Sequence, residues 1–302
     1  MKRIYFAIAL CALAISSIAC DICGCGGGNF YLGMLPKFKH RFFGVRYQYM
    51  SSYTQLAADA SQFSYNYYNT IELWNGWNIG NKWQLLTFVP YRINKQVDDD
   101  GISSNSGLGD ISLLANYQLF HTRKVNDKNV AVEQELWIGG GIKLPTGRFK
   151  ANVNDPATTI ADVNAQLGTG STDFIANVMY DISINSFGVN TTATYKVNTT
   201  KNSYQFGDKF IASSLAYYRF RTNGMGISPN LGLMYENTAG NLLQGQKVTA
   251  TGGYVSSITT GVELSLDKIA IGCTLQTPFD QNYAAGQTQL KMRGTVHVTL
   301  AL

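Results

Sequence analysis

Hydrophobic and polar residues alternate along most of the chain from about residue 41 onward. In the stretch FFGVRYQY, the alternation places Phe43, Val45 and Tyr47 on one face and Arg46 and Gln48 on the other. The stretches GDISLLANYQL and TDFIANVMYDI divide in the same way. Because successive side chains of a β-strand point to opposite sides, this period of two predicts strands with one apolar and one polar face.

About twelve such stretches follow one another. They are centred near residues 46, 74, 88, 113, 139, 177, 193, 214, 231, 260, 273 and 297. Short connections occur at NIGNK, INS, RTNG and LDK, and they alternate with longer polar ones such as NKQVDDDGISSNS and the segment at about 148–171. An even number of strands, with short turns alternating with long loops, is typical of outer-membrane β-barrels.

The expected fold is therefore an all-β, transmembrane, antiparallel up-and-down β-barrel with short periplasmic turns and long extracellular loops. A soluble β-sandwich or lipocalin-like barrel would show the same alternation, with its apolar face turned toward a core. The composition favours the membrane, because only 14% of residues are charged and 12% are aromatic, against a usual charged share of about 25%. Beyond the N-terminus no apolar run is long enough for a membrane-spanning helix.

The N-terminal sequence MKRIYFAIALCALAISSIAC has a basic start, an apolar run and a small-residue site before Cys20. This pattern predicts a signal peptide over residues 1–19 rather than a retained anchor. A Cys- and Gly-rich periplasmic leader or plug over residues 20–40 and a barrel over residues 41–302 complete the expected organisation. Loss of Lys2 and Arg3 lowers the formal net charge from +5 to about +3, which argues against nucleic acid as a partner.

An even strand count puts both termini on one side of the membrane. With short turns on the periplasmic side, we expect both termini in the periplasm and the barrel in the outer membrane of a diderm bacterium. The expected partners are outer-membrane lipid, the outer-membrane assembly machinery, and a small-molecule or metal solute.

Three cysteines, Cys20, Cys23 and Cys25, open the predicted leader in the order C-x-x-C-x-C. Three thiolates this close suit copper(I) or zinc. Two other fates for these thiols stay open, since Cys20 could instead be acylated, or could form a disulfide with Cys23 in the oxidising periplasm. A plain flexible linker is the remaining interpretation, whereas Cys273 lies on the apolar, outward set and is a poor partner.

Charged residues on the polar face are the candidates for a selective lumen, because rings of charge tune pores. They are Arg46, Glu72, Arg92, Asp110, Glu133, Glu135, Lys143, Asp173, Asp181, Lys196, Lys209, Arg219, Glu236, Glu263, Arg293 and His297. The alternative is an ion-pair network that fills a narrow barrel, since about eight strands are filled by side chains and about sixteen leave a water channel.

No catalytic constellation is expected in this chain. The sequence has three histidines, and it lacks the G-x-S-x-G pattern of a serine nucleophile. His297 falls on the polar, inward set, where a hydrogen-bonded packing role is the usual one. We therefore expect a protein that is not an enzyme.

Four stretches resemble one known family. They are TFVPYRIN (87–94), SGLGDISLLANYQL (106–119), GGGIKLPTGRF (139–149) and GTGSTDFIANVMYDI (168–182). They are similar to the outer-membrane transporter barrels related to the MetA-pathway phenol-degradation proteins, and the Cys-rich leader resembles that of a subset of this family. The resemblance implies an outer-membrane pore or transporter and supplies no catalytic residues.

The function expected from the sequence is that of an outer-membrane transporter or pore for a small solute, with a leader that can bind a soft metal. One alternative is a non-conducting barrel scaffold whose loop at about 148–171 binds at the cell surface. Another is a lipidated copper-handling protein that the barrel anchors.

Overall fold

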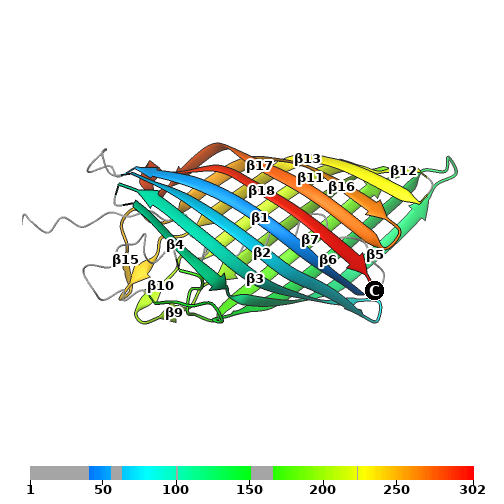
Figure 1. Cartoon of the computed structure of the whole chain (residues 1–302). Helices are drawn as coiled ribbons and strands as arrows, with labels where there is room; N and C mark the ends of the chain where they lie inside the picture. The colour runs from blue at the N-terminus through cyan, green and yellow to red at the C-terminus, as the bar shows by residue number, and fades with distance from the viewer. Residues whose placement is uncertain (1–40, 56–62, 100, 151–165, 223) are drawn as a thin grey trace, which may run out of the picture.

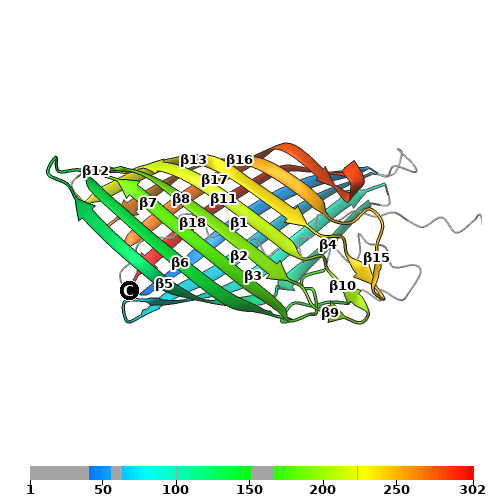
Figure 2. The ribbon, with the colours of Figure 1, turned by 180° about the vertical axis from the view of Figure 1, so that it is seen from behind.

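The computed structural model describes residues 41–55, 63–99, 101–150, 166–222 and 224–302. Within these residues the chain is a closed antiparallel β-barrel (Figures 1 and 2). No helix in the described part is long and apolar enough to cross a membrane. The predicted signal peptide, the leader and Cys20, Cys23 and Cys25 lie outside the described residues.

The barrel wall is built from fourteen strand segments. They are β1 (Arg41–Gln55), β2 (Phe63–Ile79), β3 (Trp83–Asp98), β4 (Gly101–Leu108), β5 (Ile111–Val125), β6 (Ala131–Leu144), β7 (Asp173–Ile184), β8 (Phe187–Val197), β11 (Lys209–Tyr218), β12 (Phe220–Thr222), β13 (Met225–Thr238), β16 (Gly253–Leu266), β17 (Ile269–Tyr283) and β18 (Thr288–Ala301). Both β4 and β5 pair with β3, and both β11 and β12 pair with β13, so each pair acts as one wall strand. The barrel thus has twelve wall strands, as predicted, and every predicted centre falls in one of them.

The two ends of the barrel differ. At the turn end, short connections join β2 to β3, β5 to β6, β7 to β8 and β16 to β17, and the C-terminus lies at the same end (Figure 1). At the loop end, β9 (Thr200–Lys201), β10 (Tyr204–Gln205), β14 (Leu242–Leu243) and β15 (Gln246–Lys247) form a small four-stranded sheet. A short 3₁₀ turn, η1 (Ala284–Gly286), joins β17 to β18 there.

Burial follows the predicted alternation closely. In β1, Phe43, Val45 and Tyr47 are 42–44% exposed on the outer wall, whereas Arg46 and Gln48 are buried inside. The outer wall carries large apolar side chains on every side, a surface that suits lipid and not water. The expectation of a barrel with its apolar face outward is therefore confirmed.

One local expectation was wrong, and one strand departs from simple alternation. The connection NKQVDDDGISSNS was predicted to be a long loop, but β3 and β4 continue into it as a hairpin that pairs Asn94 with Asn105. In β18, a β-bulge skips Lys291: Ser51 of β1 pairs with Met292, and Ser52 pairs with Leu290. The inward and outward positions of β18 therefore exchange on the two sides of the bulge. Lys291, which strict alternation from the inward Arg293 would turn inward, is exposed beside the ring of Tyr53, and Leu290 is buried instead.

Inward-facing glycines make room for large inward side chains on neighbouring strands. A Cβ at Gly76 would collide with the ring of Phe42, and a Cβ at Gly188 would collide with Tyr217. A glycine thus creates the volume that an aromatic ring on the next strand occupies. This pairing lets a twelve-stranded wall carry bulky groups in its interior.

The clash at Gly76 yields a stability prediction. We expect Gly76→Ala to destabilise the folded barrel by about 1–3 kcal/mol, because the added methyl group overpacks the interior against Phe42. Urea unfolding in lipid vesicles, followed by the loss of the folded band on unboiled gels, measures the change.

The matched control is Gly140→Ala, because this glycine is exposed on the outer wall and a Cβ there would lie 3.7 Å from Ile175 O, an ordinary van der Waals contact. Equal destabilisation by the two variants would contradict the packing argument.

Candidate functional site in the barrel interior

All of the predicted lumen residues lie on the inward face of the wall. Those that are almost fully buried are Arg46, Glu72, Arg92, Asp110, Lys143, Asp173, Asp181, Lys196, Lys209, Glu236 and Arg293. Those that are half-buried are Glu133, Glu135, Arg219, Glu263 and His297. Whether they select a solute stays a prediction, and their contacts show how they are held.

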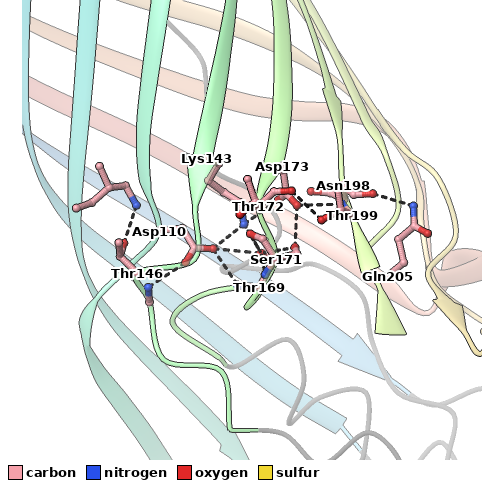
Figure 3. A network of polar contacts seen from close by, with 12 residues as sticks. Asp110, Lys143, Thr146, Thr169, Ser171, Thr172, Asp173, Asn198, Thr199 and Gln205 are labelled. Atoms are coloured by element: carbon pink, nitrogen blue, oxygen red, sulfur yellow. Dashed lines mark hydrogen bonds and ion pairs between the residues drawn. The ribbon is translucent and has the colours of Figure 1, made fainter. Parts of the chain in front are cut away.

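One network lies where β5, β6 and β7 meet the loop end (Figure 3). The Lys143 ammonium contacts Asp110 Oδ2 at 2.6 Å and Asp173 Oδ2 at 2.7 Å, and all three side chains are at most 2% exposed. Asp110 also accepts hydrogen bonds from the backbone N–H groups of Gly147 and Thr169. Charges this deeply buried need such partners, and the network ties two stretches of the β6–β7 connection to the wall.

A second network joins β11, β13, β17 and β18. Glu236 accepts from Lys209 Nζ at 2.8 Å, from Arg293 Nη1 at 3.2 Å and from the Tyr283 hydroxyl at 2.9 Å. Arg293 also contacts Gln276 Oε1 at 3.3 Å. A single buried carboxylate therefore forms ion pairs with two cations on this side of the barrel.

The middle of the barrel combines ion pairs with aromatic rings. Arg46 is paired with Glu72, and its guanidinium lies 5.5 Å from the centroids of both Trp74 and Phe88. On the neighbouring wall, His297 Nε2 lies 3.0 Å from Glu263 Oε1. Because Arg46 is paired with Glu72 and Glu263 contacts His297, this part of the lumen presents rings and partnered polar groups rather than isolated ions.

Toward the turn end the interior becomes more accessible. The side chains of His121 and Glu133 are 45% and 29% exposed, and they contact each other at 2.9 Å. Deeper in the barrel, Tyr217 donates to Asp181 at 2.9 Å and accepts from Arg219 at 2.6 Å. The inward charges at this end thus line a polar mouth.

Sequence reasoning missed an apolar feature of the interior, which we call the apolar stripe. It consists of the buried residues Phe42, Trp74, Leu86, Phe88, Leu114 and Ile175. The rings of Phe42 and Trp74 meet edge to face at 4.9 Å, and those of Trp74 and Phe88 stack at 6.3 Å. Four of these residues lie in one row of directly paired positions that runs across neighbouring strands: Phe42, Leu86, Leu114 and Ile175. In this row Phe42 pairs with Gly76, Leu86 pairs with Leu114, and Gly141 pairs with Ile175.

A sequence signal for the apolar stripe does exist. Adjacent apolar residues interrupt the alternation at Phe42–Phe43, Leu73–Trp74, Leu85–Leu86 and Leu113–Leu114. In a wall strand, one member of such a pair must face inward. From the alternation alone, apolar residues were assigned to the lipid-facing side, so these inward apolar positions were missed.

No metal site emerges within the described residues, where no group of three or more histidine, cysteine, aspartate or glutamate side chains could hold an ion. Cys273 is exposed on the outer wall, as predicted. The soft-metal, acylation and disulfide hypotheses for Cys20, Cys23 and Cys25 therefore stay predictions.

Two solved structures show how widely this architecture is shared. An outer-membrane channel from Pseudomonas putida F1 has a TM-score of 0.59 and 13% sequence identity, and the alignment covers 86% of this chain and 95% of that one. The transport unit of the autotransporter AIDA-I from Escherichia coli has a TM-score of 0.50 and 9% identity, with 91% and 95% covered. At these identities the likeness shows the outer-membrane barrel fold.

Sequence comparison with curated proteins finds no significant match. A family profile, in contrast, matches most of the barrel, from residue 47 to residue 270. That range includes all four stretches whose resemblance the sequence had indicated. The chain therefore belongs to the family described as the putative MetA-pathway of phenol degradation.

Proposed function

We propose that the protein is an outer-membrane channel through which small aromatic molecules such as phenol diffuse. The apolar stripe carries this proposal, because it places three aromatic rings and three aliphatic side chains on the inward face of a membrane barrel. A small ring that leaves water gains about 25 cal/mol per Å² of apolar surface buried, and it gains more where it meets another ring. The family description points to the same class of solute.

The proposed orientation follows from the two ends. Short turns face the periplasm by the usual rule for these barrels, so the turn end and both termini lie there. Solute would enter at the loop end, pass the apolar stripe and leave through the polar mouth around His121 and Glu133. Paired charges along this route spare a neutral solute the cost of contact with an unpaired ion.

A non-conducting scaffold is the second candidate, and one observation favours it. Inward polar side chains such as Asn116 and Thr259 are at most 1% exposed, so the interior is closely packed at those positions. A barrel filled in this way could serve as a rigid support for binding at its loops.

Electrical recording and solute uptake separate the two candidates. We expect the full mature protein, reconstituted in planar bilayers, to give conductance steps in potassium chloride. We also expect outer-membrane vesicles or cells that contain it to take up labelled phenol faster than cells without it, because lipopolysaccharide slows phenol otherwise. A folded protein that neither conducts nor speeds uptake would be a scaffold.

A second prediction tests the apolar stripe itself. We expect Leu114→Asn to slow phenol uptake about three- to tenfold, since it replaces an apolar contact worth about 1 kcal/mol with an amide. Initial rates of uptake at low phenol concentration measure the effect.

The matched control is Leu215→Asn, because Leu215 is equally buried but belongs to a separate interior cluster with Ile211 and Met234. If both variants slow uptake to the same extent at equal amounts of folded protein, the apolar stripe is not the route.

A further inference from the structure

Lys95 and Lys291 are the cationic side chains that the described wall strands turn outward near the loop end. The other lysines and arginines of these strands near that end are buried on the inward face: Arg92, Lys143, Lys196, Lys209 and Arg293. Lys95 and Lys291 are exposed instead, on the wall that faces lipid. Charge on this wall is costly in the middle of the bilayer and much less costly near its surface. The two lysines therefore point to the level of the lipid headgroups.

The β-bulge in β18 gives Lys291 its outward position. Leu290 and Arg293 are both buried inside, so the skipped residue between them is turned toward lipid. The Lys291 ammonium donates to Gln289 Oε1 at 2.8 Å and lies 5.5 Å from the centroid of the Tyr53 ring. Among the described residues, the ion pairs involve neither Lys291 nor Lys95. Both ammonium groups are therefore available to an anion outside the barrel.

The two lysines lie at nearly the same height on the wall. Lys95 pairs with Tyr67, and Tyr67 pairs with Ser51. Ser51 pairs with Met292, the residue that follows Lys291. β18, β1, β2 and β3 lie side by side in Figure 1, and neighbouring strands are about 4.8 Å apart, so three spacings separate the two lysine backbones by about 14 Å.

Aromatic side chains cover β1 and β2, the two strands that lie between the lysines. The rings of Tyr53 and Tyr65 are 5.0 Å apart, and those of Phe63 and Tyr65 are 5.9 Å apart. Phe63 and Tyr65 are 37% and 43% exposed. Tyrosine rings of this kind are typical of the interface between lipid and water.

We call this surface the loop-end patch. It consists of Tyr53, Phe63, Tyr65, Tyr67, Lys95 and Lys291. Beyond Lys291, the next strand, β17, carries the exposed Asp280. A carboxylate repels anions, so the cationic surface ends there.

We propose that the loop-end patch binds lipid A, the phosphorylated sugar headgroup of lipopolysaccharide, in the outer leaflet. Lipid A carries a phosphate at each end of a disaccharide, so one phosphate would lie beside each lysine and the sugars would lie over the tyrosine rings. The flexible lysine stems let each ammonium reach the headgroup while the methylene groups stay against the wall. A phospholipid, with its single phosphate, would engage only one of the two lysines.

The proposal rests on the orientation given in the proposed function, with the loop end outward, and not on the identity of the solute. Titration of the purified, full mature protein in detergent, followed by native mass spectrometry, tests it. The probes are lipid A, dephosphorylated lipid A and phosphatidylglycerol. We expect lipid A to bind more tightly than either of the other two.

Lys95→Met and Lys291→Met should each weaken lipid A binding about fivefold, the usual contribution of one cation at an anionic lipid surface. The double variant should lose about twentyfold or more, since the two sites are far enough apart to act independently. Lys291→Arg should bind as the wild type does, because it keeps the charge.

Lys124→Met is the matched control, because Lys124 is an exposed lysine at the turn end, where β5 pairs with β6. Lipid A binding should be unchanged in this variant.

The proposal is wrong if wild-type protein binds dephosphorylated lipid A or phosphatidylglycerol as tightly as lipid A, a comparison that needs no variant to fold. It is also wrong if the folded double variant binds lipid A as the wild type does, or if Lys124→Met weakens binding to the same extent. Conductance and phenol uptake without lipid A binding would leave the channel standing and remove only this patch. Lipid A binding without conductance or uptake would keep the patch and remove the channel.

Discussion

The sheet closes on itself, and the rest of the structure depends on that closure. In hydrocarbon no water is present to satisfy an unpaired backbone N–H or C=O, so a spanning sheet with free edges would lose several kcal/mol at each such group. Here β1 pairs with β18 from Phe42 to Thr54, and β11 pairs with β13, so the ring is complete. Once the ring exists, inside and outside are fixed, and the alternation of the sequence decides which side chain meets lipid.

Closure also determines the environment of the inward side chains. Charges that face inward are removed from bulk water, and the described contacts show them gathered into shared pairs, such as Lys143 between Asp110 and Asp173. Rings that face inward occupy space that a glycine on the next strand leaves free, as Phe42 does beside Gly76. Because these contacts form between neighbouring strands, the lumen has distinct regions: a polar mouth, the apolar stripe and the two buried ion-pair networks.

The sequence predicted a large part of this arrangement, for a physical reason. Alternation is a local property, so it located all twelve wall strands and put residues such as Arg46 and Lys143 on the inward face. The bulge near Lys291 could not be predicted from alternation, because it depends on the register of β18 against β1. The hydrogen bond from the Thr169 N–H to Asp110 joins residues that are 59 positions apart in the sequence. A local pattern of residues cannot predict such a contact. The apolar stripe had a local signal, but its meaning depends on which member of each apolar pair faces inward.

The seam between β1 and β18 has a consequence for the time course of folding. The backbone N–H of Leu302 bonds to the carbonyl of Arg41 at 2.8 Å, so the two strands that complete the ring come from opposite ends of the described chain. Such non-local pairing carries a large loop-closure entropy and is intrinsically slow. Until it forms, both edges of the curved sheet are open and can pair with the wrong strand. The pairing of β1 with β18 therefore governs the moment at which the open sheet becomes a sealed barrel.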